Sequence, residues 1–231
     1  MEILPLNYAL NSGKPLFLAL MFGHLLFDFY LQPSAWVKDK FAKNYLSPYL
    51  YLHAALHALP ALVFTGDVLL ALFIAVTHLV IDSIKIAVKQ DTAKAFIFDQ
   101  AAHIAVLIGA LYWFKPDVLI QLPTNYIIST IVAFMWVLTP ASLFIQRCFP
   151  NRNNQTGTDG IGRAIGYCER SLILCCIMAH QYEAIGWLLA SKSILRFRLN
   201  DKTAHSEYVL LGTLISLMIV VSIGSAWRLA Q

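Results

Sequence analysis

Charged side chains are scarce in this sequence: Asp, Glu, Lys and Arg together make up 13% of its 231 residues. Soluble globular domains carry about 25% charged residues, and disordered chains are also polar and highly charged. Hydrophobic residues reach 58%, and the mean hydropathy is +0.64. So little charge cannot cover a water-facing surface. The composition therefore excludes a soluble or disordered protein and predicts an all-α polytopic membrane protein.

Cysteine is also scarce, with four residues in the chain and no CxxC pattern among them. We interpret these cysteines as reduced packing residues rather than metal ligands. The basic residues are spread over short, evenly spaced joints, which is not the clustered pattern of a nucleic-acid-binding surface. The expected partners are therefore the lipid bilayer and a membrane-soluble substrate, without nucleic acid. The sequence does not indicate the oligomeric state.

About eight transmembrane helices are expected, because a span needs about 20 apolar residues. The segments are 15–33, 46–65, 68–88, 95–114, 126–147, 164–180, 183–199 and 208–228. Turn signals such as Thr65-Gly66-Asp67 separate them. The polar stretch 150–163 is the expected linker between two four-helix halves, with residues 1–149 before it and the C-terminal helices of 164–231 after it.

Lysine and arginine alternate along these joints. Thirteen of the 17 fall at every second joint, among them Lys38, Lys40 and Lys43 after the first segment and Lys85, Lys89 and Lys94 after the third. Cytoplasmic loops of membrane proteins carry such an excess. We therefore expect a multi-pass protein of the bacterial cytoplasmic membrane with both termini outside and four basic loops in the cytoplasm.

The first four segments each contain an unusual pair of polar residues spaced i, i+4. This spacing places both side chains on one face of a helix. Charged groups at the centre of a span cost roughly 2.5–3.5 kcal/mol each and usually mark function. The pairs are His24/Asp28, His53/His57, His78/Asp82 and Asp99/His103.

These pairs also align in depth if the four segments alternate in direction. The histidines His24, His57, His78 and His103 then form a deeper layer, and Asp28, His53, Asp82 and Asp99 form a layer nearer the cytoplasm. A short repeat supports this arrangement, because His-Leu-x-x-Asp occurs at both His24 and His78. Two similar hairpins would then face a common polar centre, as in bundle-core metal sites.

Imidazole and carboxylate together are ligands for zinc, manganese, iron or nickel. Eight candidates exceed one four-coordinate site, so they suit either two adjacent metals or one metal surrounded by Asp–His hydrogen bonds. A proton relay, an ion path and purely structural helix–helix hydrogen bonding are the alternatives. We favour a divalent metal (zinc, manganese or iron), with Asp28, Asp82 and Asp99 as candidate catalytic carboxylates.

In the second half, Glu169, Arg170 and Lys192 are candidates for substrate binding. A cation near a buried metal can bind a phosphate or carboxylate and stabilise charge that develops during reaction. The alternative is that Glu169 pairs with Arg170 or Lys192 and that the set is structural.

The opening motif His24-Leu-Leu-Phe-Asp28-Phe-Tyr-Leu-Gln32, followed by the three later pairs, resembles a family of small bacterial inner-membrane proteins known only as a domain of unknown function. Gly166-Tyr-Cys-Glu169-Arg170 is similar to a stretch in its longer members. The resemblance implies a bacterial inner-membrane location but no reaction. A looser similarity exists to bacterial membrane proteins described as metal-dependent hydrolases, which also carry paired His and Asp residues in their spans. This similarity is an analogy only.

From these patterns the leading hypothesis is an intramembrane metal-dependent enzyme. It would be a hydrolase of a lipid-linked or membrane-soluble substrate, with its site open toward the cytoplasm. A transporter of divalent cations or protons could use the same residues. A structural or partner-binding membrane protein is the third possibility.

Overall fold

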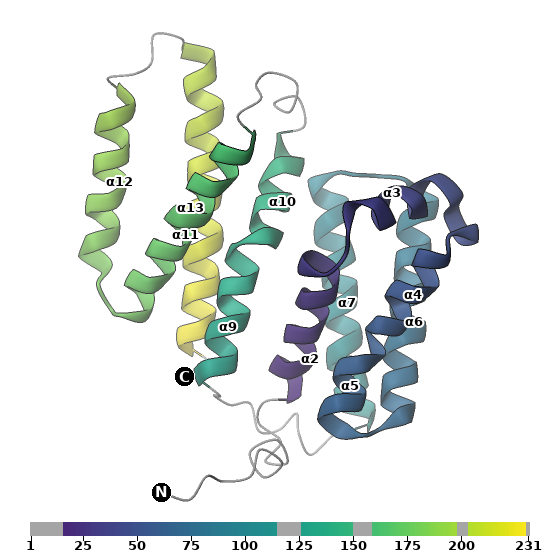
Figure 1. Cartoon of the computed structure of the whole chain (residues 1–231). Helices are drawn as coiled ribbons and strands as arrows, with labels where there is room; N and C mark the ends of the chain where they lie inside the picture. Colours follow the sequence, from purple (N-terminus) through teal and green to yellow (C-terminus); the bar gives the residue numbers. More distant parts are fainter. Residues whose placement is uncertain (1–15, 115–125, 150–158, 198–202, 230–231) are drawn as a thin grey trace, which may run out of the picture. The chain divides into compact units, whose positions relative to one another are not determined.

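The computed structural model describes residues 16–114, 126–149, 159–197 and 203–229, and all regular elements in these ranges are helical. The expected all-α class is confirmed for this part of the chain. The elements, shown in Figure 1, are α2 (Leu16–Leu25), the π-helical turn η1 (Leu26–Tyr30), α3 (Ser34–Lys43), the 3-10 turn η2 (Asn44–Leu46), α4 (Pro48–Leu56), α5 (Ala58–Thr65), α6 (Val68–Val88), α7 (Ala93–Phe114), α9 (Tyr126–Val137), α10 (Thr139–Cys148), α11 (Asp159–Met178), α12 (Tyr182–Phe197) and α13 (Thr203–Leu229).

Helices occupy each of the eight expected segments, but fewer of them meet the requirements of a membrane span. Within the described residues, four helical segments are long and apolar enough to cross a bilayer: Val68–Val88, Ala93–Phe114, Tyr126–Cys148 and Leu210–Leu229. A fifth span is counted if Leu16–Tyr30 and Ser34–Leu46, which meet at 80°, act together. This part of the chain thus has four or five candidate membrane spans by length and composition. Eight crossings and the orientation of the termini stay predictions.

The joint after the first segment is not a loop but a second helix, α3. Pro33 fixes its own φ at −65° and disfavours helical geometry at the residue before it, so the first helix ends at the π-helical turn. The chain then continues at a sharp angle. This turn matters because it directs Lys40 of α3 into the protein, where its side chain is buried.

Proline also divides the second segment into α4 and α5. Pro60 has no N–H, and its ring would clash with the carbonyl oxygen of Leu56, so the helix breaks at His57. The end of α5 follows the expected turn signal: Gly66 takes a left-handed φ of 66°, and Asp67 accepts a hydrogen bond from the N–H of Leu70 to begin α6.

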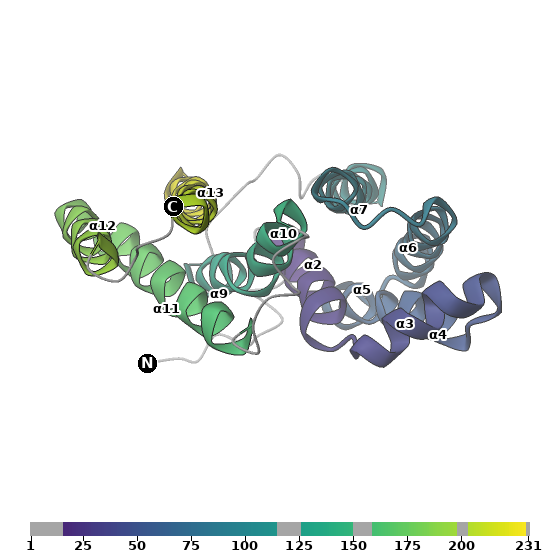
Figure 2. The ribbon, with the colours of Figure 1, turned by 90° about the horizontal axis from the view of Figure 1, so that it is seen from above.

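The described residues form two compact units, one ending at Val132 and the other comprising Ala133–Leu229. In the first unit α2 contacts α5, α5 contacts α6, α6 contacts α7, and α7 contacts α2. The view from above shows these helices as a ring, with α4 continuing the line of α5 (Figure 2). A closed ring of four has an interior that each helix faces, and this interior positions the polar pairs.

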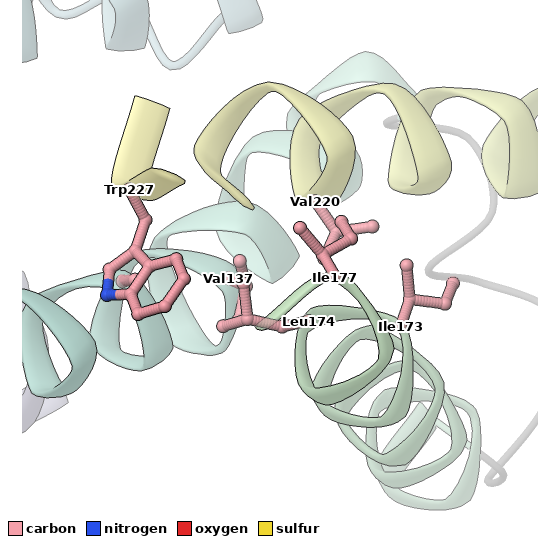
Figure 3. Packing of buried hydrophobic residues seen from close by; sticks show 7 residues of the cluster. Val137, Ile173, Leu174, Ile177, Val220 and Trp227 are labelled. Carbon is pink, nitrogen blue, oxygen red and sulfur yellow. The ribbon is translucent and has the colours of Figure 1, made fainter. Parts of the chain in front are cut away.

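The second unit packs around an apolar cluster contributed by α9, α11 and α13. Val137, Leu174 and Val220 are fully enclosed in it, and Ile173, Ile177 and Trp227 complete its lining (Figure 3). Residues 150–158, which include most of the expected linker, lie outside the described ranges.

A buried arginine stabilises the break between α9 and α10. Pro140 interrupts the helix there, and the guanidinium of Arg170 on α11 donates to the carbonyl oxygens of Val137 and Leu138. It also reaches the hydroxyls of Ser142, at 2.5 Å, and Ser216, at 3.3 Å. Arg170 thus supplies donors where the proline interrupts the regular helix.

Replacing Arg170 by leucine should destabilise the second unit by roughly 2–4 kcal/mol, because buried carbonyl and hydroxyl groups lose a charged donor. Thermal unfolding of the detergent-purified protein measures this loss. Arg163→Leu is the control, since Arg163 lies on the same helix but is exposed. Equal unfolding temperatures for the two variants would contradict the assigned role.

Candidate metal centre

The eight polar residues of the first four segments all reach the interior of the first unit. His24 comes from α2, His53 from α4, and His57 from the break that follows it. The remaining members are Asp28 on η1, His78 and Asp82 on α6, and Asp99 and His103 on α7. Seven of them are buried, and the Asp28 side chain is 9% exposed. We call these eight residues the His/Asp cluster.

Asp28 lies at the centre of four imidazoles. Its Oδ1 atom is 3.0 Å from Nε2 of both His53 and His57 and 3.6 Å from Nε2 of His78. Its Oδ2 atom is 3.8 Å from Nε2 of His24. A π-helical turn presents this carboxylate, and such turns are frequent at functional sites.

The imidazole rings pack face to face. The rings of His57 and His78 stack with centroids 3.5 Å apart, and those of His78 and His103 at 4.2 Å. His24 completes the group, with its centroid 5.0 Å from that of His103. Close stacking of several rings fits neutral imidazoles, which are the form that binds metals.

Within the described residues, three sets in this cluster have the spacing of metal ligands. They are His24, Asp28, His57 and His78; then His53, His78 and Asp82; and finally Asp82, Asp99 and His103. The ligand atoms of each set lie within 4.8 Å of one another. Ligands about 2.0–2.2 Å from one tetrahedral metal are roughly 3.3–3.6 Å apart, so the packing is close to what coordination needs. The chain thus has buried His/Asp groups positioned to bind a metal ion.

Several polar atoms in the cluster have no hydrogen-bond partner although they are buried. Nε2 of His57 is one of them: it lies 3.0 Å from a carboxylate oxygen but is not aligned for a hydrogen bond. Oδ1 of Asp99 and Nε2 of His103 are two more, 3.7 Å apart. Unpaired buried polar atoms are costly and call for an explanation. A bound cation that accepts their lone pairs would be a direct explanation.

Three further residues join the cluster that the sequence patterns did not single out. Nζ of Lys40 lies 2.6 Å from Oδ2 of Asp82, and Nζ of Lys85 lies 2.6 Å from Oδ2 of Asp99. The charge pattern of the sequence places both lysines in the basic joints between segments. The side-chain amide of Gln100 donates to Oδ2 of Asp99, and its oxygen lies 3.2 Å from Nε2 of His24.

A sequence signal existed for one of these three residues. Lys85 follows Asp82 by three positions and His78 by seven, so it shares their face of the helix. Lys40 gave no such signal, because it reaches Asp82 only through the bend at Pro33. Gln100 lies next to Asp99 in the sequence, and only the packing of α7 against α2 brings it to His24.

A small pocket adjoins the histidines. Four histidines (His24, His57, His78 and His103) and three apolar residues (Ile74, Val106 and Leu107) line it. No carboxylate of the cluster is among these lining residues.

The three candidate substrate-binding residues lie in the second unit and have partners there. Nζ of Lys192 is 2.5 Å from Oε2 of Glu169, and Arg170 donates to the carbonyl oxygen of Val137 at the break between α9 and α10. These contacts match the structural alternative for the set. A role in substrate binding stays a prediction.

The cluster depends on close approach of α2 and α5 at Gly23. A Cβ atom at this position would lie 2.1 Å from Cγ of Pro60, whose ring has little freedom to move. Gly23 precedes His24, and Pro60 follows His57 by three residues. The absence of a side chain therefore lets these two histidines come together.

Gly23→Ala should separate the two helices and cost roughly 1–3 kcal/mol of stability, as overpacking does. Gly109→Ala on α7 is the matched control, because a Cβ atom there meets nothing within 4 Å. Alanine should be neutral or stabilising at that position. Thermal unfolding in detergent compares the two. A Gly23→Ala protein as stable as the control would argue against the tight contact.

The comparisons with known proteins give a family but no activity. Residues 16–130 match the family model DUF3307, described as a protein of unknown function. No curated protein and no solved structure matches the chain. The matched region contains all eight residues of the His/Asp cluster together with Lys40, Lys85 and Gln100. Residues 16–130 thus match a DUF3307 domain, which covers just under half of the chain.

Proposed function

We propose that this protein is an intramembrane metal-dependent enzyme, a hydrolase of a lipid-linked or membrane-soluble substrate. Its site would lie in the bacterial cytoplasmic membrane and open toward the cytoplasm. The observation that carries the proposal is the convergence of eight His and Asp side chains, seven of them buried, from four sequence segments into sets with metal-ligand spacing.

Energetics favour a ligand over a purely structural role. Ionised carboxylates inside a membrane protein cost several kcal/mol unless they are compensated. Lysines compensate Asp82 and Asp99, but Asp28 faces four imidazoles and no lysine contact is seen among the described residues. Helix–helix hydrogen bonding alone would not leave Nε2 of His57 and His103 unpaired. A divalent cation accounts for both features.

The chain's own residues suggest a division of roles. His24, Asp28, His57 and His78 would hold the ion, which supplies Lewis-acid activation of water and of the scissile group. Asp99 is the best candidate for a general base, because Lys85 and Gln100 fix its Oδ2 atom while Oδ1 is unpaired.

The interior beyond the histidines favours an enzyme over a transporter. On this side of the cluster the buried residues of α2, α5, α6 and α7 in the described structure are apolar, such as Leu20, Ala61, Leu70 and Leu111. A transport path needs polar or ionisable side chains along its whole length. The cluster instead lies at the end of an apolar interior, as a dead-end site would.

Protein purified without chelator should contain bound divalent metal. Asp28→Asn should weaken its binding by at least about 100-fold, because even outer-shell partners of a metal cost 10–100-fold. His180→Asn is the control: His180 is exposed outside the cluster, and asparagine tolerates its φ of 59°. Elemental analysis and chelator competition measure the binding. Metal-free wild-type protein would refute the proposal.

Retention of the ion separates the enzyme from the transporter. The bound metal should survive dialysis, and proteoliposomes should show no flux of Zn²⁺ or Mn²⁺ above that of empty vesicles, because the apolar interior offers no exit. Flux that disappears in Asp28→Asn would instead establish transport by the same residues.

A further inference from the structure

Two of the three ligand sets in the His/Asp cluster share no residue, and these two parts of the cluster differ in charge. The third set, His53, His78 and Asp82, overlaps both. One part, the His24/Asp28/His57/His78 set, has a single carboxylate and no lysine contact. The other part, the Asp82/Asp99/His103 set, has two carboxylates, and each is in contact with a lysine. Both sets have the spacing of metal ligands, so geometry alone would allow two ions.

We propose that Lys40 and Lys85 act as built-in cations that restrict the centre to one divalent ion, held by His24, Asp28, His57 and His78. The inference rests on the proposed metal centre and specifies its occupancy. Each ammonium lies 2.6 Å from a carboxylate oxygen of the second set. A metal there would have to displace the lysines or bind beside them.

Charge balance supports a single ion. With neutral imidazoles, the three carboxylates and two ammonium groups leave one net negative charge. One divalent ion changes this to one net positive charge, and a second ion would raise it to three. Water does not screen such an excess in a buried site, so the second ion is strongly disfavoured while both lysines are present.

The side chain of Lys40 is far more buried than that of an ordinary surface lysine. Its side chain is 6% exposed, although it comes from α3, which carries exposed charges on its other face. The neighbouring Lys43 shows the contrast: it pairs with Asp39 on the same helix and is 57% exposed. The bend at Pro33 thus delivers one of the three lysines of α3 to the cluster and leaves Lys38 and Lys43 exposed.

The Asp82/Asp99/His103 set would be able to bind a metal ion if the lysines did not already neutralise its carboxylates. Oδ1 of Asp99 and Nε2 of His103 are buried and 3.7 Å apart, neither has a hydrogen-bond partner, and Asp82 completes three ligand atoms within 4.8 Å. Removing a lysine charge should therefore not only weaken an ion pair. It should create a second binding position for a metal.

The test is a count of ions per chain. Full-length protein is purified in detergent, stripped with EDTA, and titrated with Zn²⁺ and separately with Mn²⁺, with elemental analysis after desalting. The wild type should bind one ion. Lys40→Met and Lys85→Met should each bind two, Lys40→Arg should stay at one because the charge is kept, and Lys43→Met should stay at one as the matched control on α3.

A double variant identifies the ligands of the second ion. Lys40→Met combined with His103→Ala should return the count to one, because the Asp82/Asp99/His103 set loses a ligand. Lys85 is partly exposed, so its replacement provides a test that does not depend on folding of the Lys40 variant.

The outcomes separate this inference from the proposed function. Two ions in the wild type, or one ion in both methionine variants, would overturn the role of the lysines and leave the metal centre standing. No ion in the wild type would overturn the metal centre itself and the inference with it.

Discussion

The first unit depends on compensating charge in an interior that has little water. Three carboxylates and five imidazoles face one another inside a ring of apolar helices, where an unpaired carboxylate is costly. Lys40 on α3 and Lys85 on α6 compensate the charges of Asp82 and Asp99. Asp28 is left with imidazoles alone, and this imbalance is the reason for assigning it a cation.

The irregular features of the backbone serve this arrangement. The π-helical turn presents Asp28, Pro33 bends the chain so that α3 can deliver Lys40, and Pro60 breaks the helix at His57. Gly23 allows α2 to approach Pro60 closely. Regular helices would place the same residues on suitable faces, but these departures bring the side chains into contact. They are concentrated in the unit that holds the site, as expected where function constrains the backbone.

Much of the site could be predicted from its spacing. An i, i+4 pair survives any rotation of its helix, so the pairing of His78 with Asp82 and of Asp99 with His103 required no tertiary information. The helix positions followed from apolar segment length. The joint containing Lys40 could not be predicted as a helix that directs a lysine into the interior, because four of the ten residues of α3 are charged and its position is set by the bend. The contacts of Arg170 with the carbonyl oxygens of Val137 and Leu138 could not be predicted either, because they depend on the packing of α11 against the break at Pro140.

The sequence by itself determined that this is a helical membrane protein and which eight side chains belong together. Scarcity of charge and fixed helical periodicity are local properties that survive without a fold. Only the tertiary structure decided which carboxylates are paired with lysine and which is not, because Lys40 and Asp82 are 42 residues apart and meet through the bend at Pro33. The difference between a carboxylate surrounded by imidazoles and one in contact with a lysine is a property of packing, and no periodicity in the chain encodes it.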